Sequence, residues 1–252
     1  MCYWPQDLLP KDFPNCRILT YGYDSTVSRF FSGTANQTNI LGHAKTFLAE
    51  FEEHRRDAPD RPLVFIVHSL GGLLLKAVLR QASESNTAAV GASIRRGICM
   101  STTGTIFLGT PHRGSTYAGL AELVSGVAKV ACFDRSANLL RDLRVDASIL
   151  EVLDDSFSRL YLTYRFTLFT FEESQGLGIP FMAGHKVVQS WSAHLGYIGE
   201  EKGVINADHR SMCRFSGPDA PGYGQLRRAI ERCLTRTNGT PGPIVPMREP
   251  SG

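Results

Sequence analysis

The sequence predicts one α/β domain, in which a mostly parallel sheet is covered by helices on both faces. Two short apolar runs rich in β-branched residues, Arg17 to Tyr21 and Leu63 to Val67, are typical of strands buried on both faces. Each is followed by a helical pattern, and the alternation of strands and helices continues along the chain. In such a fold the functional side chains are expected at the carboxyl ends of the strands.

The other elements follow from the same patterns. Apolar residues recur at helical spacing from Ile40 to Phe51, with Thr38 or Asn39 placed to cap the first turn of a crossover helix. The later patterns predict a helix at about 72–81, a strand at Thr105–Leu108, helical segments at about 116–131 and 136–160, a strand near Tyr164–Thr170 and a last short strand at Lys186–Gln189.

The length and composition suit a single domain. A chain of 252 residues, 42% of them hydrophobic, can bury one α/β core, and a second complete domain would be hard to fit. The apolar stripe from Leu226 to Leu234 predicts a closing helix, and the Pro/Gly-rich, aperiodic stretch after it predicts a disordered tail. We expect the domain to occupy residues 1–236 and the tail residues 237–252.

Composition and charge argue against several classes of function. The 27 Lys and Arg against 24 Asp and Glu give a net charge of +3, too small and dispersed for nucleic-acid binding. No apolar run reaches the roughly 20 residues of a membrane span, and no signal peptide is visible. The six cysteines show no zinc-binding spacing, and no phosphate-binding loop or dinucleotide motif is present. We expect a cytoplasmic protein with reduced thiols, no metal and no cofactor.

The sharpest chemical signal is the stretch from Phe65 to Gly72 (FIVHSLGG), where an apolar strand passes through one polar step into a glycine-rich helix start. This pattern is typical of a nucleophile elbow, a strained turn that projects a serine Oγ above the sheet. Ser69 would be the nucleophile, and the N–H of Leu70 would face the developing oxyanion. Val67 replaces the first glycine of the usual G-x-S-x-G pattern, and a serine that merely caps the helix is the alternative interpretation.

A serine nucleophile needs a histidine base and a carboxylate that fixes the tautomer of that histidine. In folds with this elbow, the chain order is serine, acid, histidine. Glu172 and Glu173 directly follow a predicted strand, and His209 lies on a polar loop after the last one. A solvated acidic pair is the alternative interpretation of the two glutamates, but the presence of Ser69 and His209 in the same chain favours a triad.

Several motifs occur in an order that is similar to a known family. They are Asp7–Pro10 (DLLP), Arg17–Asp24 (RILTYGYD), His68–Gly72 (HSLGG), Ile106–Ser115 (IFLGTPHRGS), Asp208–His209 (DH) and Met212–Phe215 (MCRF). With them the chain resembles the lipase-like serine esterase family of α/β-hydrolases, which is common in fungi and often fused there to NACHT or NB-ARC domains. The inositol deacylases of GPI anchors are more distant relatives.

The resemblance implies an α/β-hydrolase fold and assigns roles to particular residues. Ser69 matches the nucleophile and His209 the base, while the acidic pattern after the strand favours Glu173 and leaves Glu172 open. His112 and Arg113 match a motif that could line the mouth of the site. A strand-end turn rich in glycine and proline explains that motif without a catalytic duty, and we favour this structural interpretation.

The chain departs from the family at its beginning. Family members carry, before the segment that starts near Trp4, a strand ending in a His-Gly-Leu-Gly-like loop that supplies the second backbone donor of the oxyanion hole. The resemblance therefore implies that a central strand between those at Arg17–Tyr21 and Leu63–Val67 is absent, that the domain is incomplete at its N-terminus, and that only the Leu70 N–H is identifiable as a donor. A late-assigned start codon, a natural truncation whose strands pair directly, and a degenerate copy are all open.

The leading hypothesis is a carboxylic ester hydrolase that acts on lipid or other small-molecule esters through an acyl-enzyme on Ser69. One alternative is a catalytically impaired interaction or signalling module that keeps the fold. Another is an accessory hydrolase or thioesterase of a biosynthetic pathway, which would use the same triad on a different substrate.

Overall fold

The computed structural model describes residues 2–23, 36–85, 92–112, 147–176, 186 and 188–235. In these residues four strands form one sheet in the order β1-β2-β3-β4, and every pairing is parallel. The strands are β1 Leu63–His68, β2 Thr102–Leu108, β3 Thr167–Glu173 and β4 Glu200–Ile205. Each strand lies beside the next one in sequence, as connections through helices on the faces of a sheet allow.

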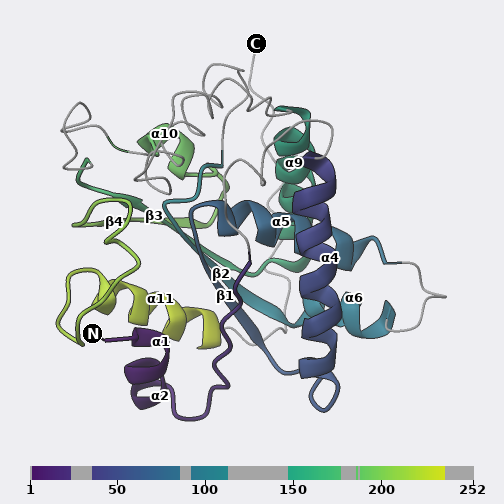
Figure 1. Ribbon diagram of the computed structural model, residues 1–252, viewed down its shortest axis with the longest axis horizontal. Coiled ribbons are helices and arrows are strands. Elements are labelled where there is room, and N and C mark those ends of the chain that lie inside the picture. Colours follow the sequence, from purple (N-terminus) through teal and green to yellow (C-terminus); the bar gives the residue numbers. More distant parts are fainter. Residues whose placement is uncertain are drawn as a thin grey trace.

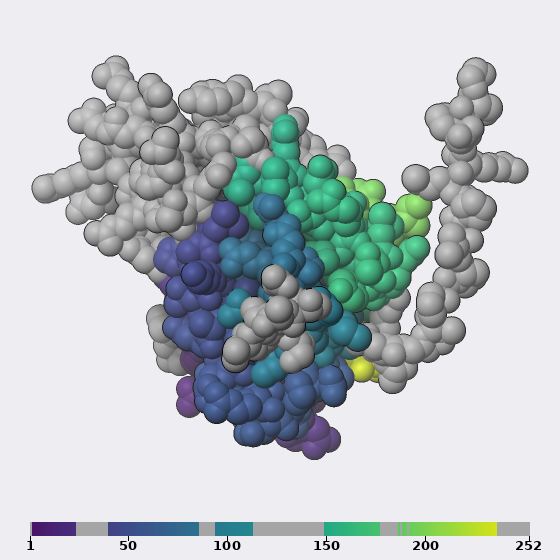
Figure 2. Space-filling model, turned by 90° about the vertical axis from the view of Figure 1, so that its right-hand side faces the viewer, coloured from purple at the N-terminus to yellow at the C-terminus, as the bar shows by residue number. Residues whose placement is uncertain are grey.

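Helices cover both faces of this sheet (Figure 1). One face carries the helices α4 Asn36–Arg55, α5 Leu70–Ser83, α6 Ala92–Ser101 and α9 Ala147–Tyr164. The other carries α1 Trp4–Asp7, α2 Leu9–Asp12 and α11 Tyr223–Thr235, while the short α10 Ser190–Ala193 lies beside the end of β3. Figure 2 shows the first face from outside, with side chains of α4, α6 and α9 lying next to one another over it.

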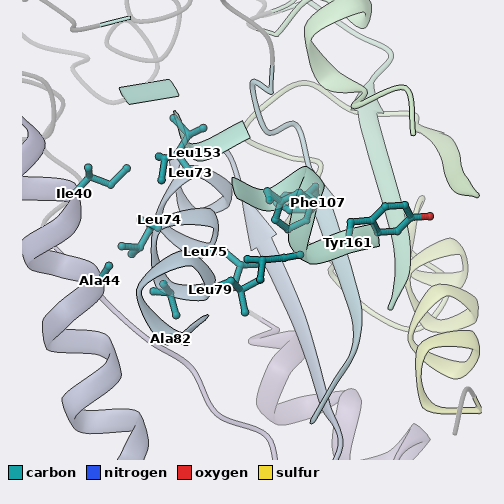
Figure 3. Close-up of a cluster of buried hydrophobic side chains, with 14 of the residues drawn as sticks. Ile40, Ala44, Leu73, Leu74, Leu75, Leu79, Ala82, Phe107, Leu153 and Tyr161 are labelled. Carbon is teal, nitrogen blue, oxygen red and sulfur yellow. The ribbon is translucent and has the colours of Figure 1, made fainter. Parts of the chain in front are cut away.

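The hydrophobic core has two parts, one on each face of the sheet. Side chains alternate along a strand, so Phe107 of β2 joins the cluster under α5, whereas Ile106 and Leu108 join the cluster under α11. Figure 3 shows the first cluster, in which Ile40 and Ala44 of α4 face the leucines of α5. Burial of this apolar surface supplies the main stabilisation of the fold.

Helix α5 lies at the centre of the larger cluster, and ten of its 14 residues are buried. A helix that is apolar on nearly all sides fits only between other elements, and α5 is enclosed by β1, α4, α6 and α9. The one charged residue in its core, Lys76, pairs with Asp154 of α9 at 2.7 Å. The sheet and α9 therefore hold the start of α5 in a fixed position above the end of β1.

The predicted α/β class, a parallel sheet with helices on both faces, is confirmed, and three of the predicted strands appear as β1, β2 and β3. The predicted crossover and closing helices are α4 and α11, and the predicted helix at 72–81 is α5. Helix α4 starts at Asn36, so Thr38 and Asn39 lie inside it, and their prediction as caps is wrong. The predicted helix at 116–131 and tail at 237–252 lie outside the described residues, and the segment at 136–160 is described only from residue 147 onward.

Two strand predictions are wrong. Residues Arg17–Tyr21 form no strand, because they pair with none of the strands in the described residues; a groove lies between them and β1. The stretch predicted as the last strand, Lys186–Gln189, has no strand residue among its described positions. The last strand is β4, whose charged beginning at Glu200 hides it from an apolar pattern search.

Candidate active site

Ser69 is the single residue between β1, which ends at His68, and α5, which begins at Leu70. Its backbone has φ 52° and ψ −127°, a conformation that costs a residue with a side chain about 1–3 kcal/mol. Backbone hydrogen bonds hold it there: the Ser69 N–H donates to Leu108 O at 3.0 Å, and the Gly72 N–H donates to Ser69 O at 3.0 Å. The structure thus contains the strained strand-to-helix turn that the sequence predicts.

Two glycines let the surrounding backbone approach this turn. A Cβ on Gly72 would lie 2.3 Å from the Thr110 side chain, so only glycine permits the end of β2 to pass so close to α5. Gly109 has φ +53°, and a Cβ there would lie 3.1 Å from the ring of His209. Because neither glycine has a side chain, the loop that carries His209 and the turn at Ser69 can approach each other closely.

The strand register brings the serine and the acid to one edge of the sheet. His68 at the end of β1 lies beside Leu108 of β2, which in turn lies beside Phe171 of β3. Ser69 and Glu173 follow these positions by one and two residues, so their side chains extend from the same carboxyl edge.

His209 joins the two side chains. Its Nε2 lies 3.0 Å from Ser69 Oγ, and its Nδ1 lies 3.1 Å from Glu173 Oε2. A carboxylate can only accept, so Nδ1 carries the proton and Nε2 is left as the acceptor for the Ser69 hydroxyl. The imidazole and the carboxylate are both buried, with 1% and 0% of their side chains exposed. This arrangement can move a proton from Ser69 to His209.

The two adjacent glutamates of β3 have different surroundings, because successive side chains of a strand point to opposite faces. Glu173 also accepts the Val188 N–H through Oε1 at 2.9 Å, which holds its carboxylate toward His209. Glu172 instead pairs with Lys186 at 3.2 Å. Burial raises the pKa of Glu172, but hydrogen bonds from Ser190 and Lys186 outweigh burial and lower it below its usual value.

His68 contacts His209 directly, and the sequence interpretation gave it no role. Its Nε2 donates to the His209 carbonyl at 2.8 Å, and the two rings lie 4.8 Å apart between centroids. Burial and the nearby His209 lower the pKa of His68 to about 4, so it is neutral at pH 7. Its place next to Ser69 was the one sequence signal that pointed to this contact.

The start of α5 offers a site for negative charge. The first N–H groups of a helix have no partner within it, and they lie at the positive end of the helix dipole. Leu70 is the first residue of α5, so its N–H is one of these donors beside Ser69.

His112 is buried beside the same edge. The ring of His112 packs edge-on against Phe107 with 4.6 Å between centroids. The backbone N–H of His112 donates to Ser192 O at 2.7 Å. These contacts tie the turn after β2 to α10 and agree with a structural role. Arg113 lies outside the described residues.

A groove of about 740 Å³ follows the open edge of β1. The strand forms one wall, residues 15–21 and Tyr23 form part of the opposite side, and the lining reaches His68 and Gly71 at the serine turn. All six residues of β1 are partly exposed, unlike those of β2, which are all buried. The groove lies where the family resemblance implies a further strand.

The comparisons with known proteins give relatives over nearly the whole chain. Mouse Protein SERAC1 is 29% identical over 233 residues, and the human protein is 28% identical over the same length. The chain is similar to the SERAC1 proteins. The alignments cover 92% of this chain but only 33% of each SERAC1 protein, so the chain spans about a third of the length of these relatives.

No family model matches the chain. Among solved structures, the thioesterase domain from the curacin biosynthetic pathway aligns with a TM-score of 0.40 and 11% identity, covering 83% of this chain and 76% of that one. Within the described residues, no helix combines the length and the apolar character that crossing a membrane requires.

Proposed function

We propose that this chain is a serine hydrolase that cleaves carboxylic esters through an acyl-enzyme on Ser69. The observation that carries the proposal is the pair of hydrogen bonds, 3.0 Å and 3.1 Å long, that links Ser69, His209 and Glu173 at a strained strand-to-helix turn. A helix-capping serine needs neither a buried histidine nor a buried carboxylate behind it. Ser69, moreover, makes no side-chain hydrogen bond to the start of α5.

The first half-reaction would form the acyl-enzyme. His209 Nε2 takes the hydroxyl proton as Ser69 Oγ attacks the ester carbonyl carbon, and the carbonyl oxygen becomes an oxyanion facing the Leu70 N–H. The tetrahedral intermediate collapses when His209 donates that proton to the departing alcohol. Glu173 keeps Nδ1 protonated and stabilises the imidazolium.

The second half-reaction would repeat these steps with water. His209 removes a proton from water, the hydroxide attacks the acyl carbon, and Ser69 leaves with the proton that His209 returns. The products are a carboxylic acid and an alcohol. The mainly apolar lining of the groove next to the serine turn supports lipid or other apolar small-molecule esters as substrates.

The test is hydrolysis of p-nitrophenyl butyrate and of a butyryl thioester by the purified chain. The variants are Ser69→Ala and His209→Gln, with Ser156→Ala of α9 as the matched control. We expect Ser69→Ala to reduce kcat about 10⁴-fold and Ser156→Ala to change it less than about twofold. Equal rates in Ser69→Ala and the parent would contradict the proposal.

A catalytically impaired interaction module is the second candidate. The edge position of β1 in the sheet of the described residues favours it, because an edge strand can bind another strand. This candidate predicts no esterase activity in the parent chain. An accessory thioesterase would use the same triad, and the thioester arm of the assay distinguishes it by its ratio of thioester to ester turnover.

A further inference from the structure

The turn that carries His209 is tied to its surroundings by two sets of hydrogen bonds. Within the turn, Asp208 Oδ1 accepts the backbone N–H groups of Arg210 and Ser211 at 3.0 and 2.8 Å. From outside it, His68 Nε2 donates to the His209 carbonyl at 2.8 Å. This second bond joins residues 141 positions apart and connects the loop of the base to the end of β1.

We propose that His68 is a positioning residue for ester hydrolysis: its Nε2–H holds the backbone of His209 and so keeps the imidazole of His209 within hydrogen-bonding reach of Ser69. The inference rests on the proposed function and adds to it a residue that acts through the base. No bond to His68 forms or breaks in the reaction, because the proton moves between Ser69 and His209.

The place of His68 in the chain suits this role. His68 directly precedes Ser69, so one strand end carries both the nucleophile and the group that holds its base. The Ser69 N–H is itself anchored to Leu108 O at 3.0 Å. A small movement of this strand end would therefore carry the serine and the His209 turn together, which preserves the 3.0 Å between Ser69 Oγ and His209 Nε2.

The ring of His68 also restricts the ring of His209. The two imidazoles lie 4.8 Å apart between centroids and are tilted by 43°. A base must be held within a few tenths of an ångström of the reacting geometry, and a misplacement of about 1 Å costs up to about 10²-fold in rate. The backbone bond and the ring contact both act against such a misplacement.

His68 donates this bond without carrying a charge. Burial and the nearby His209 lower the pKa of His68 to about 4, against the opposing effects of the bond to the His209 carbonyl and of Glu173. Arg214 adds a smaller effect in the same direction as burial. His209 becomes a cation when it takes the serine proton, and a second positive charge this close would oppose that step. A neutral donor positions the base without this cost.

The first test compares His68→Leu, which removes the donor, with His68→Gln, whose amide nitrogen can take the place of Nε2. We expect His68→Leu to lower kcat for the butyrate ester about 10–10²-fold, with KM changed less than about threefold. His68→Gln should restore kcat to within about threefold of the parent. The matched control is His54→Leu, which replaces an exposed histidine of α4 and should change kcat less than about twofold.

The second test asks whether His68 acts through His209. His209→Gln removes the base but keeps the backbone carbonyl. In this background His68→Leu should change the residual rate less than about threefold, because no base is left to position. Urea unfolding identifies the variants that are folded at the assay temperature. If His68→Leu is not folded, His68→Asn takes its place, because its shorter amide does not reach the His209 carbonyl.

Three outcomes overturn the inference. In the first, the folded variant without the donor keeps the parent's kcat. In the second, His68→Gln loses as much activity as His68→Leu. In the third, removal of the donor costs the same factor with and without His209, which would mean a general structural role. If the parent itself does not hydrolyse the ester, the proposed function fails and the inference falls with it, a result that the parent's rate alone identifies.

Discussion

At the scale of single residues, successive side chains of β3 point to opposite faces of the sheet. This places two neighbouring glutamates in different surroundings, although the residues alone did not show which of them is the better candidate for the acid. Glu173 faces His209 from a fully buried position, whereas Glu172 faces Lys186 and Ser190. A shift of one residue in the strand would exchange the two environments.

Replacing each glutamate by glutamine tests this difference. Glu173→Gln removes the charge that stabilises the imidazolium and allows the wrong tautomer of His209, so kcat should fall about 10²–10⁴-fold. Glu172→Gln loses only a partly exposed ion pair and should leave kcat within about threefold of the parent. The kcat of ester hydrolysis is the measurement, and equal losses in both variants would contradict the assignment.

His68 makes stability depend on pH in a defined direction. Its pKa is about 4 in the folded chain against an ordinary value of 6.5, so between these values the unfolded chain binds a proton that the folded chain does not. The free energy of unfolding therefore falls as the pH drops from 6.5 toward 4, by at most about 3 kcal/mol at 1.36 kcal/mol per pH unit.

Urea unfolding of the parent and of His68→Gln at pH 7, 6 and 5 tests this effect. Glutamine can still donate to the His209 carbonyl but does not titrate, so its stability should fall less steeply over this range. The difference between the two curves isolates His68 from carboxylates that titrate in both proteins. Parallel curves would show that His68 is not buried as a neutral ring.

At the scale of elements, the start of α5 depends on a close approach between this helix and the end of β2. Alanine is normally a better helix residue than glycine by about 1 kcal/mol. At Gly72 the added Cβ would meet Thr110 at 2.3 Å, whereas at Gly97 of α6 the nearest atom would be Pro59 O at 3.9 Å.

Gly72→Ala and Gly97→Ala should therefore change stability in opposite directions. We expect Gly72→Ala to lower the free energy of unfolding by about 1–3 kcal/mol through overpacking, and Gly97→Ala to leave it unchanged or raise it by up to about 1 kcal/mol. Urea unfolding of the two variants measures both. An increase in Gly72→Ala would mean that α5 and β2 do not approach in this way.

The buried pair of Lys76 and Asp154 joins α5 to α9. Burial lowers the pKa of Lys76, and Asp154 partly offsets this. Replacing the lysine with methionine, which keeps most of its volume, should be neutral or stabilising. Asp154→Ala leaves the ammonium without its partner and should cost about 1–3 kcal/mol, less than for a fully buried pair, because 35% of the Asp154 side chain is exposed. If Lys76→Met destabilises more than Asp154→Ala in thermal unfolding, this account of the pair is wrong.

At the scale of the whole molecule, the sequence predicted the parts of the fold that depend on continuous apolar burial. Strand β1 and helix α5 are apolar along most of their length, and β2 ends in the apolar run Ile106–Leu108, so the pattern shows these elements directly. Strand β4 lies at the edge of the sheet, and its charged residues interrupt the pattern. Arg17–Tyr21 has the composition of a strand but pairs with no strand in the part of the chain that the structure describes, and pairing is a property that composition does not specify.

The candidate site, too, was predictable from the sequence only in part. The order of Ser69, Glu173 and His209 was predictable because each side chain lies at the end of a strand or shortly after it, and parallel strands bring their carboxyl ends together. The contact of His68 with the carbonyl of His209 joins residues 141 positions apart and depends on the path of a loop.

Covalent labelling tests the central claim, a reactive Ser69, most directly. The folded chain would be treated with a fluorophosphonate at pH 7.5 and the adduct located by peptide mass spectrometry, with Ser69→Ala and Ser156→Ala in parallel. The account predicts one adduct on Ser69 in the parent and in Ser156→Ala, and none in Ser69→Ala. A folded parent that forms no adduct, or one that carries it on another residue, would contradict the account.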